Sequence, residues 1–336
     1  MLPIVRVPNH YLPPASSALL GQAPRTPIEA LPLVPTPSVN SDISRAYIES
    51  PHLTSYTRSN RRWLTVLDAF LSIHLGLRVR DRLAILANIT LMLTYPVGIL
   101  ARRVNHPLPY PLRIPYVLRL SSGTLHAPGG LHFLQAASHI DSPITQVINE
   151  LVSGTFVDVG ASVGLYTLQA AQKLGARGRV FSFEPAPDRF KSLQRNILTN
   201  RLSNVTARCC AVGAIDGEAY LLDLTCGPNP RDISVATDAH MVRPAHARRI
   251  PIQRLDSLIQ ADEPVALVKV DVEGAESEVF LGMTTILDTC RPIIVFEALS
   301  ATAARVCSEI LSKHGYEVSG SAPGDLVARP AQIDVP

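Results

Sequence analysis

The sequence lacks the patterns on which disulfide-rich, zinc-binding and secreted proteins depend. Its cysteines are odd in number and show no C-x-x-C spacing, so neither a disulfide framework nor a zinc site is expected (Cys209, Cys210, Cys226, Cys290 and Cys307). The first residues contain no basic segment followed by an unbroken apolar run, so a cleaved secretory signal is not expected. These absences favour free thiols in a reducing compartment, the cytoplasm.

Charge is also scarce. Only 18% of the residues are charged, 46% are hydrophobic, and the formal net charge is +3. There is no lysine-rich run and no basic stripe interleaved with aromatic residues, so nucleic-acid binding is not expected. A chain of 336 residues fits one sizeable α/β domain with additional segments, or two small domains.

The N-terminal third has two unusual compositions. Residues 1–60 are rich in proline, which removes backbone donors and interrupts helices, so a disordered tail is predicted, with an arm lying along the domain as the alternative. Residues 61–106 are apolar: helical spacing runs from Trp63 to Leu77, and residues 83–101 contain no charged side chain. Three interpretations of this apolar region stay open: helices packed on the rest of the protein, a helix at a membrane surface, or a membrane span.

The remaining sequence alternates between strand-like and helix-like patterns. Two short strands are expected around Ser121–Gly123, and a helix near residues 142–151. Strands are then predicted at 155–159, 179–183, 205–212, 266–270 and 292–297, with helices at 165–174, 188–200 and 275–288. This alternation predicts a mainly parallel, doubly wound α/β sheet, in which ligands bind at the carboxyl ends of the strands.

The strand at 155–159 runs into a glycine loop, Asp158-Val-Gly160-Ala-Ser162-Val-Gly164. A glycine loop at a helix N-terminus lets a ligand approach the backbone closely, although a tight turn also needs glycine. The spacing is G-x-x-x-G rather than G-x-G-x-x-G, which disfavours a dinucleotide pyrophosphate site.

The same loop also contains the G-x-S-x-G pattern of the nucleophile elbow in α/β-hydrolases. An esterase that used Ser162 would need an acid and a later histidine, and Asp256 or Asp288 with His314 could supply them. This interpretation leaves the acidic residues at two strand ends unexplained, so it is the weaker alternative.

Glu184 follows the strand at 179–183, twenty residues after Gly164. A carboxylate at the tip of the neighbouring strand can accept hydrogen bonds from both hydroxyls of a ribose. The sequence therefore predicts a nucleoside ligand, with a solvated acid in a turn as the alternative. The strand at 266–270 ends in two further carboxylates, Asp271 and Glu273, at the same edge of the predicted sheet.

Six segments together resemble the FkbM-type S-adenosylmethionine-dependent methyltransferase family: residues 156–164, 183–185, 204–213, 254–258, 269–276 and 294–297. The resemblance extends over residues 112–320, and its most specific part is Lys-x-Asp-x-Glu-Gly-Ala-Glu at 269–276. It implies a class I methyltransferase fold, which is a Rossmann-like, mostly parallel doubly wound sheet whose last strand is antiparallel. The methyltransferase domain would span residues 107–336, behind an N-terminal helical extension, with residues 315–319 paired to 325–328.

The resemblance also implies the cofactor S-adenosyl-L-methionine and a set of residues that bind it. The methionine half would lie along Asp158, Gly160, Ser162 and Gly164, the ribose at Glu184, and the adenine beside Ala211 and Val212. Asp271 and Glu273 would face the methyl donor and acceptor as candidate catalytic residues, with Asp271 also contacting the cofactor. The family commonly has asparagine where this chain has Ser162, so a side-chain amide contact is lost.

Several members of the family methylate hydroxyl groups, so O-methylation of a sugar, glycolipid or natural product is expected, with a non-catalytic cofactor-binding relative as the alternative. The candidate bases are Asp271, Glu273, Glu297, His240 and His246, and the two histidines lie in an insert between Leu224 and Ile250. No dedicated metal-ligand spacing is present, so no metal ligand is assigned, and a metal that lowers the pKa of the acceptor hydroxyl stays open as an alternative.

Overall fold

The computed structural model describes residues 72–102, 114–129, 136, 142–223, 233–236 and 247–331. The predicted proline-rich tail lies outside the described residues. Most of the helix expected between Trp63 and Leu77 also lies outside them, and so do the two candidate bases His240 and His246.

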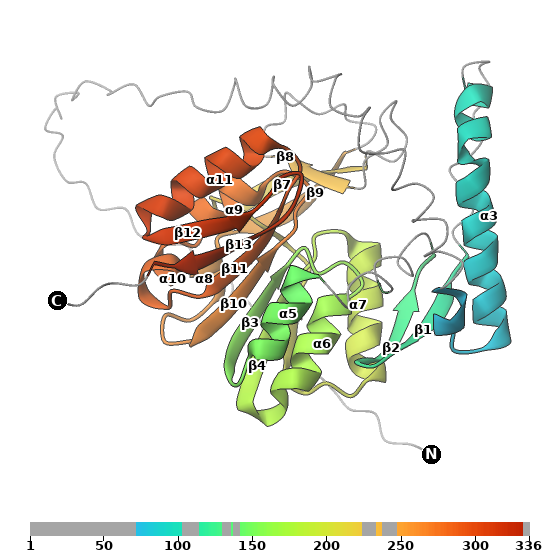
Figure 1. The fold of residues 1–336 in the computed structure, drawn as a ribbon, viewed down its shortest axis with the longest axis horizontal. Coiled ribbons are helices and arrows are strands. Elements are labelled where there is room, and N and C mark those ends of the chain that lie inside the picture. Colours follow the sequence, from blue (N-terminus) through green and yellow to red (C-terminus); the bar gives the residue numbers. More distant parts are fainter. Residues whose placement is uncertain are drawn as a thin grey trace, which may run out of the picture. The chain divides into compact units, whose positions relative to one another are not determined.

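The main sheet of the described residues has seven strands, and Figure 1 shows its arrangement. Its strand order is β12-β13-β11-β10-β3-β4-β5. The β13 strand runs antiparallel to both of its neighbours, whereas the other pairs are parallel. This arrangement confirms the predicted class I methyltransferase fold. The strands are β3 (Gly154–Val159), β4 (Gly178–Phe183), β5 (Val205–Arg208), β10 (Val265–Val270), β11 (Ile293–Ala298), β12 (Tyr316–Gly320) and β13 (Gly324–Pro330).

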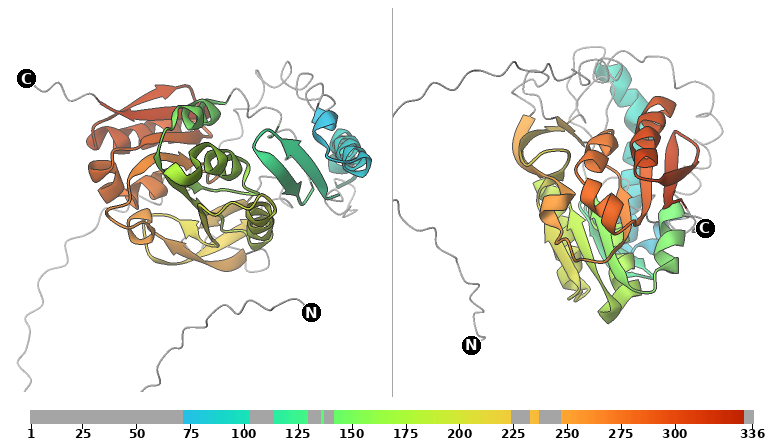
Figure 2. Two further views of the ribbon diagram at one scale, coloured as in Figure 1. Left: turned by 90° about the horizontal axis from the view of Figure 1, so that it is seen from below. Right: turned by 90° about the vertical axis from the view of Figure 1, so that its left-hand side faces the viewer.

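Helices cover both faces of this sheet (Figure 2). One face packs against α5 (Pro143–Glu150) and α6 (Leu165–Leu174) through Phe156, Leu267 and Val295. The opposite face packs against α9 (Glu276–Leu281), α10 (Thr284–Thr289) and α11 (Ala301–Lys313). Successive residues of a strand point to opposite faces, so strands covered on both sides read as continuous apolar runs.

Two predicted elements are divided in the structure. The strand expected at 205–212 splits, because β6 (Ala211–Val212) leaves the main sheet and pairs with β9 (Ala247–Gln253). The helix expected at 275–288 breaks at Gly282, where an added Cβ would collide with the carbonyl oxygen of Gly213. Both departures come from contacts between distant segments, which periodicity does not register.

A second, four-stranded sheet has the order β6-β9-β7-β8. It contains β7 (Gly217–Asp223) and β8 (Ile233–Ala236), and β7 runs antiparallel to both β8 and β9. Its buried side chains form a separate small core that includes Ala219, Ile250 and Ile252. The second sheet thus holds β6 beside the end of β4, where Ala186 joins the same core.

The N-terminal extension contains a short 3₁₀ helix, η1 (Ser72–Leu75), and α3 (Val79–Arg102). The prediction of a helix continuing to Leu77 is wrong at its end, because Gly76 forms a β-bridge with Leu118 instead. The expected hairpin is confirmed as β1 (Tyr116–Leu120) and β2 (Gly123–Ala127). Within the described residues, no helix combines the length and the apolar character that crossing a membrane requires.

Two asparagines attach the hairpin to the main domain. One, Asn196, lies in α7 (Pro187–Thr199), and the other, Asn200, is the C-cap of that helix. The Asn200 side chain accepts from the Thr124 N–H at 2.8 Å and donates to the Thr124 carbonyl at 2.7 Å. Asn196 makes the same pair of bonds with His126, at 2.7 and 3.0 Å. The two side chains therefore satisfy the open edge of β2 as a neighbouring strand would.

Candidate functional site

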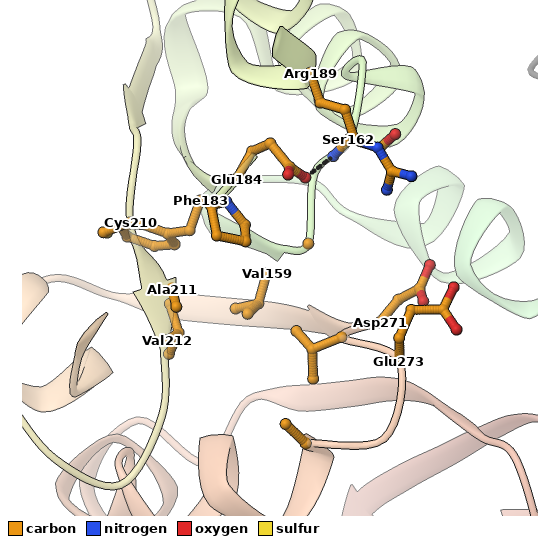
Figure 3. Close-up of a pocket in the computed structure, with 14 residues that line it drawn as sticks. Val159, Ser162, Phe183, Glu184, Arg189, Cys210, Ala211, Val212, Asp271 and Glu273 are labelled. Atoms are coloured by element: carbon orange, nitrogen blue, oxygen red, sulfur yellow. Dashed lines mark hydrogen bonds between the residues drawn. The ribbon is translucent and has the colours of Figure 1, made fainter. Parts of the chain in front are cut away.

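A pocket opens at the carboxyl ends of β3, β4 and β10 (Figure 3). It encloses about 720 Å³, counted with its open mouth. Ligands of parallel α/β sheets bind at this place, outside the carboxyl ends of the strands. The lining residues are Val159, Gly160, Ser162, Phe183, Glu184, Pro185, Arg189, Cys210, Ala211, Val212, Asp271, Val272, Glu273 and Ala275.

The glycine loop after β3 is held in left-handed backbone conformations. The φ angles are +77° at Gly160, +51° at Ser162 and +94° at Gly164. An added Cβ at Gly160 would collide with the carbonyl oxygen of Asp271, so glycine lets the ends of β3 and β10 approach each other. The N–H groups of Gly160 and Ala161 both donate to the Phe183 carbonyl, each at 3.0 Å. The loop is thus fixed between two neighbouring strand ends.

Glu184 connects the loop to the tip of β4. Its side chain is buried, with only 3% of the residue exposed, and it still lines the pocket. One carboxylate oxygen accepts from the Ser162 N–H at 2.8 Å (Figure 3). The other accepts from the Ala186 N–H, also at 2.8 Å. Burial raises the pKa of Glu184, while the Arg189 guanidinium and the two N–H donors oppose that rise. Each oxygen keeps a second lone pair for a ligand hydroxyl.

Lys269 lies behind the loop and joins the ends of β3 and β10. Its ammonium donates to the Gly160 carbonyl at 2.8 Å and lies 3.3 Å from an Asp158 oxygen and 3.5 Å from an Asp271 oxygen. Burial alone would lower the pKa of Lys269, but the two carboxylates outweigh it and raise that pKa. The other Asp158 oxygen accepts from the Thr167 hydroxyl at 2.6 Å. The lysine is therefore held charged between two acids.

Carboxylates gather at the carboxyl edge of β10 and β11. Asp271 and Glu273 line the pocket, and Glu297 stands opposite Asp325 in the pairing of β11 with β13. Burial together with the charges of Asp271, Glu273 and Asp325 raises the pKa of Glu297 to about 8. Glu297 thus exchanges its proton in the neutral to mildly basic range. Among the described residues, no group of three or more His, Cys, Asp or Glu side chains is placed to hold a metal ion.

The opposite end of the pocket is apolar. Phe183, Cys210, Ala211 and Val212 line it, and all four are buried. Burial raises the pKa of the Cys210 thiol to about 11, so this wall is neutral at physiological pH. A flat apolar group of a ligand can pack there without leaving a polar group unsatisfied.

The structure brings seven of the predicted site residues into one pocket: Gly160, Ser162, Glu184, Ala211, Val212, Asp271 and Glu273. Asp158 and Gly164 are not part of the lining. Asp158 is fully buried against Thr167 and Lys269, and Gly164 is the N-cap of α6, packed so closely on Leu193 that a Cβ would clash. Both positions thus support the conformation of the glycine loop.

Sequence reasoning did not assign roles to Lys269 and Arg189. Arg189 lies in the first turn of α7 and lines the pocket, but its sequence neighbourhood gives no signal for that position. For Lys269 a signal existed, since a charged residue stands between Val268 and Val270 in an otherwise apolar strand. A buried charge at such a position requires a partner of opposite charge.

The esterase interpretation finds no support in the geometry. His314 accepts or donates a hydrogen bond with Asp288 at 2.6 Å, but this pair precedes β12 at the amino ends of the strands. Ser162 follows the carboxyl end of β3. The predicted acid and histidine therefore lie at the opposite edge of the sheet from the serine, whereas a triad needs direct contact.

The comparisons with known proteins find methyltransferases. The model described as "Methyltransferase FkbM domain" matches residues 158–318, which confirms the resemblance predicted from the sequence. "Methyltransferase 1" of Beauveria bassiana is 30% identical over 147 residues, covering 38% of this chain and 57% of that protein. "Hexuronic acid methyltransferase AglP" of Haloferax volcanii is 32% identical over 145 residues, covering 41% and 53%. The chain thus matches little more than half the length of these two relatives.

Among solved structures, the methyltransferase FkbM from Methylobacillus flagellatus KT is similar to this chain. It has a TM-score of 0.36 and 17% sequence identity, and the match covers 78% of this chain and 58% of that one.

Proposed function

Because this chain carries a methyltransferase FkbM domain, we propose that it transfers the methyl group of S-adenosylmethionine to a hydroxyl group. The proposed acceptor is a sugar, a glycolipid or another hydroxylated natural product. The relative whose name specifies hexuronic acid methylation supports a carbohydrate acceptor. The three carboxylates near the pocket support a hydroxyl acceptor, since a neutral hydroxyl must lose its proton as it is methylated.

The observation that carries the proposal is the position of Glu184. Its carboxylate lines the pocket between the glycine loop and the apolar wall. A ribose needs paired acceptors for its two hydroxyls, an adenine needs an apolar wall, and both are within one pocket. We assign the ribose to Glu184, the adenine to Ala211 and Val212, and the methionine part to Gly160 and Ser162. Asp158 and Gly164 support the loop in this scheme.

The cofactor supplies an electrophilic methyl group on a sulfonium, and the chain supplies position and proton transfer. Placing donor and acceptor in line at near-attack distance accounts for much of the rate of such a displacement. Asp271 and Glu273 lie at the end of β10 with their carboxylates pointing the same way (Figure 3), where they can orient an acceptor hydroxyl. Glu297, whose pKa is about 8, is the carboxylate best matched to receive the proton at neutral pH.

Titration calorimetry of the full chain tests the cofactor assignment. S-adenosylmethionine and S-adenosylhomocysteine should bind, and NAD, the control nucleotide, should not. Glu184→Gln should weaken binding by about tenfold or more, because the ribose hydroxyls lose a charged acceptor. Glu309→Gln, a change of the same kind on an exposed residue of α11, should leave affinity unchanged. Equal affinity in the Glu184 variant and the wild type would contradict the assigned site.

A further inference from the structure

The first turns of α3 have one face that is buried and one that is exposed. Ile85 and Ile89 are fully buried in a cluster with Tyr116 and Leu118 of the hairpin. Asp81 is also buried, and its carboxylate accepts from the Val117 N–H at 3.1 Å. These contacts fix the rotation of the helix on the hairpin, and they decide which of its side chains face outward.

The outward face is apolar. Val79, Leu83 and Leu86 are 72%, 60% and 39% exposed, and their spacing places them on one stripe of the helix. They are three of the seven exposed large hydrophobic residues among the described part of the chain, gathered within eight positions. Single exposed leucines are ordinary on protein surfaces, but a continuous stripe marks an interaction surface.

Basic side chains lie on both sides of this stripe. At 100° per residue, Arg80 and Arg82 fall on opposite flanks of the line from Val79 to Leu86. Both arginines are exposed, and Arg80 is 3.9 Å from Asp81, the one acidic residue between Arg78 and Arg102. Because the Asp81 side chain is buried between α3 and the hairpin, the exposed charge beside the stripe is positive.

We propose that this face of α3, formed by Val79, Leu83 and Leu86 between Arg80 and Arg82, binds an anionic lipid surface. An apolar stripe flanked by arginines is the arrangement with which a helix lies in the plane of a bilayer, its apolar side chains below the head groups and its cations among the phosphates. A negatively charged membrane attracts Arg80 and Arg82 equally, because both lie at its surface when the stripe faces the bilayer. Binding to a protein partner would not require a positive charge on each side of the stripe. The proposal goes beyond methyl transfer and is independent of it.

Co-sedimentation of the full chain with vesicles tests the proposal. The protein should bind vesicles of phosphatidylcholine and phosphatidylglycerol, and bind phosphatidylcholine alone more weakly, with the difference removed by high salt. Leu83→Ser with Leu86→Ser should lower partitioning by about tenfold or more, because two leucines no longer enter the bilayer. Arg80→Gln should lower it about fivefold, on the anionic vesicles only.

A matched control uses exposed leucines elsewhere. Leu198 and Leu281 are 77% and 49% exposed, so Leu198→Ser with Leu281→Ser removes the same groups without touching α3. An equal loss of partitioning in this control, or a wild-type chain that stays in the supernatant with anionic vesicles, overturns the proposal. A dimer in light scattering that the α3 variant dissociates assigns the stripe to a second copy instead. Calorimetry with S-adenosylmethionine on the same preparations tests the proposed activity separately.

Discussion

Two glutamates, Glu184, which is buried, and Glu297, which is half-buried, stand at the same edge of the main sheet and have different surroundings. Glu184 accepts hydrogen bonds from two backbone N–H groups, and Arg189 lies nearby. Glu297 is surrounded by the carboxylates of Asp271, Glu273 and Asp325, and its pKa rises to about 8. Burial acts on both, but donors oppose it at the first and like charges add to it at the second. The comparison teaches that the same residue type serves as a fixed acceptor in one place and exchanges protons in the other.

Removing the Lys269 ammonium, which bridges the ends of β3 and β10, should have the largest effect on stability. Lys269→Met leaves Asp158 and Asp271 without their shared partner and the Gly160 carbonyl without its donor. We expect a loss of about 3–5 kcal/mol in the free energy of unfolding, measured by urea denaturation, because an uncompensated charge stays buried. Lys313→Met, at the exposed end of α11, should cost less than about 0.5 kcal/mol. Equal losses of stability in the two variants would show that Lys269 does not stabilise the contact between the ends of β3 and β10.

The close approach of the two strand ends can be tested at a single glycine. Gly160→Ala should destabilise the protein by about 2–4 kcal/mol and abolish cofactor binding, since the new Cβ meets the Asp271 carbonyl and the backbone has a positive φ. Gly175 also has a positive φ but nothing within 4 Å of an added Cβ. Gly175→Ala should therefore cost about 1–3 kcal/mol from its backbone conformation alone and leave cofactor binding intact. Thermal unfolding with calorimetry separates the two outcomes.

The role proposed for Glu297 should appear in the pH dependence of methyl transfer. If Glu297 receives the acceptor's proton, the rate should rise about fiftyfold from pH 6 to pH 8, as the deprotonated fraction of a group with this pKa increases. Glu297→Gln should have a lower rate with a flat profile over this range. A wild-type profile that is already flat above pH 6 would assign proton transfer to another group.

Replacing each of the two glutamates with glutamine should change the stability in opposite directions. Because the pKa of Glu297 in the folded protein lies above its usual value, folding retains a proton between about pH 4.5 and 8, and stability falls as pH rises through that window. Glu297→Gln should thus be more stable than wild type at pH 9, by about 2 kcal/mol once the shift is discounted for the exposure of the half-buried side chain to solvent, and equal to it at pH 4. Glu184→Gln should instead lose about 1–2 kcal/mol at pH 7, because an amide donor then faces a backbone N–H.

The parts of the site that the sequence predicted are those with a local signal. The glycine loop and Glu184 at the tip of β4 follow from strand periodicity, glycine spacing and chain order, and the pair of strands at the C-terminus was implied by the family resemblance. Contacts between distant segments gave no such signal. The partnership of Lys269 with Asp158 spans β10 and β3, and Asn196 joins α7 both to the hairpin and, at 2.8 Å, to the Val163 carbonyl of the glycine loop.

Periodicity and turn chemistry depend on near neighbours along the chain, so the sequence was enough to predict the main strands and helices, the fold class and the residue types at the strand ends. The tertiary structure decided which of those residues line the pocket and how they are protonated. In the folded protein, Asp158 and Gly164 lie outside the pocket lining, and Glu297 lies near acidic residues at the end of β10 and on β13. Burial and pKa depend on what distant strands bring within a few ångströms, and that distance is set only when the chain folds.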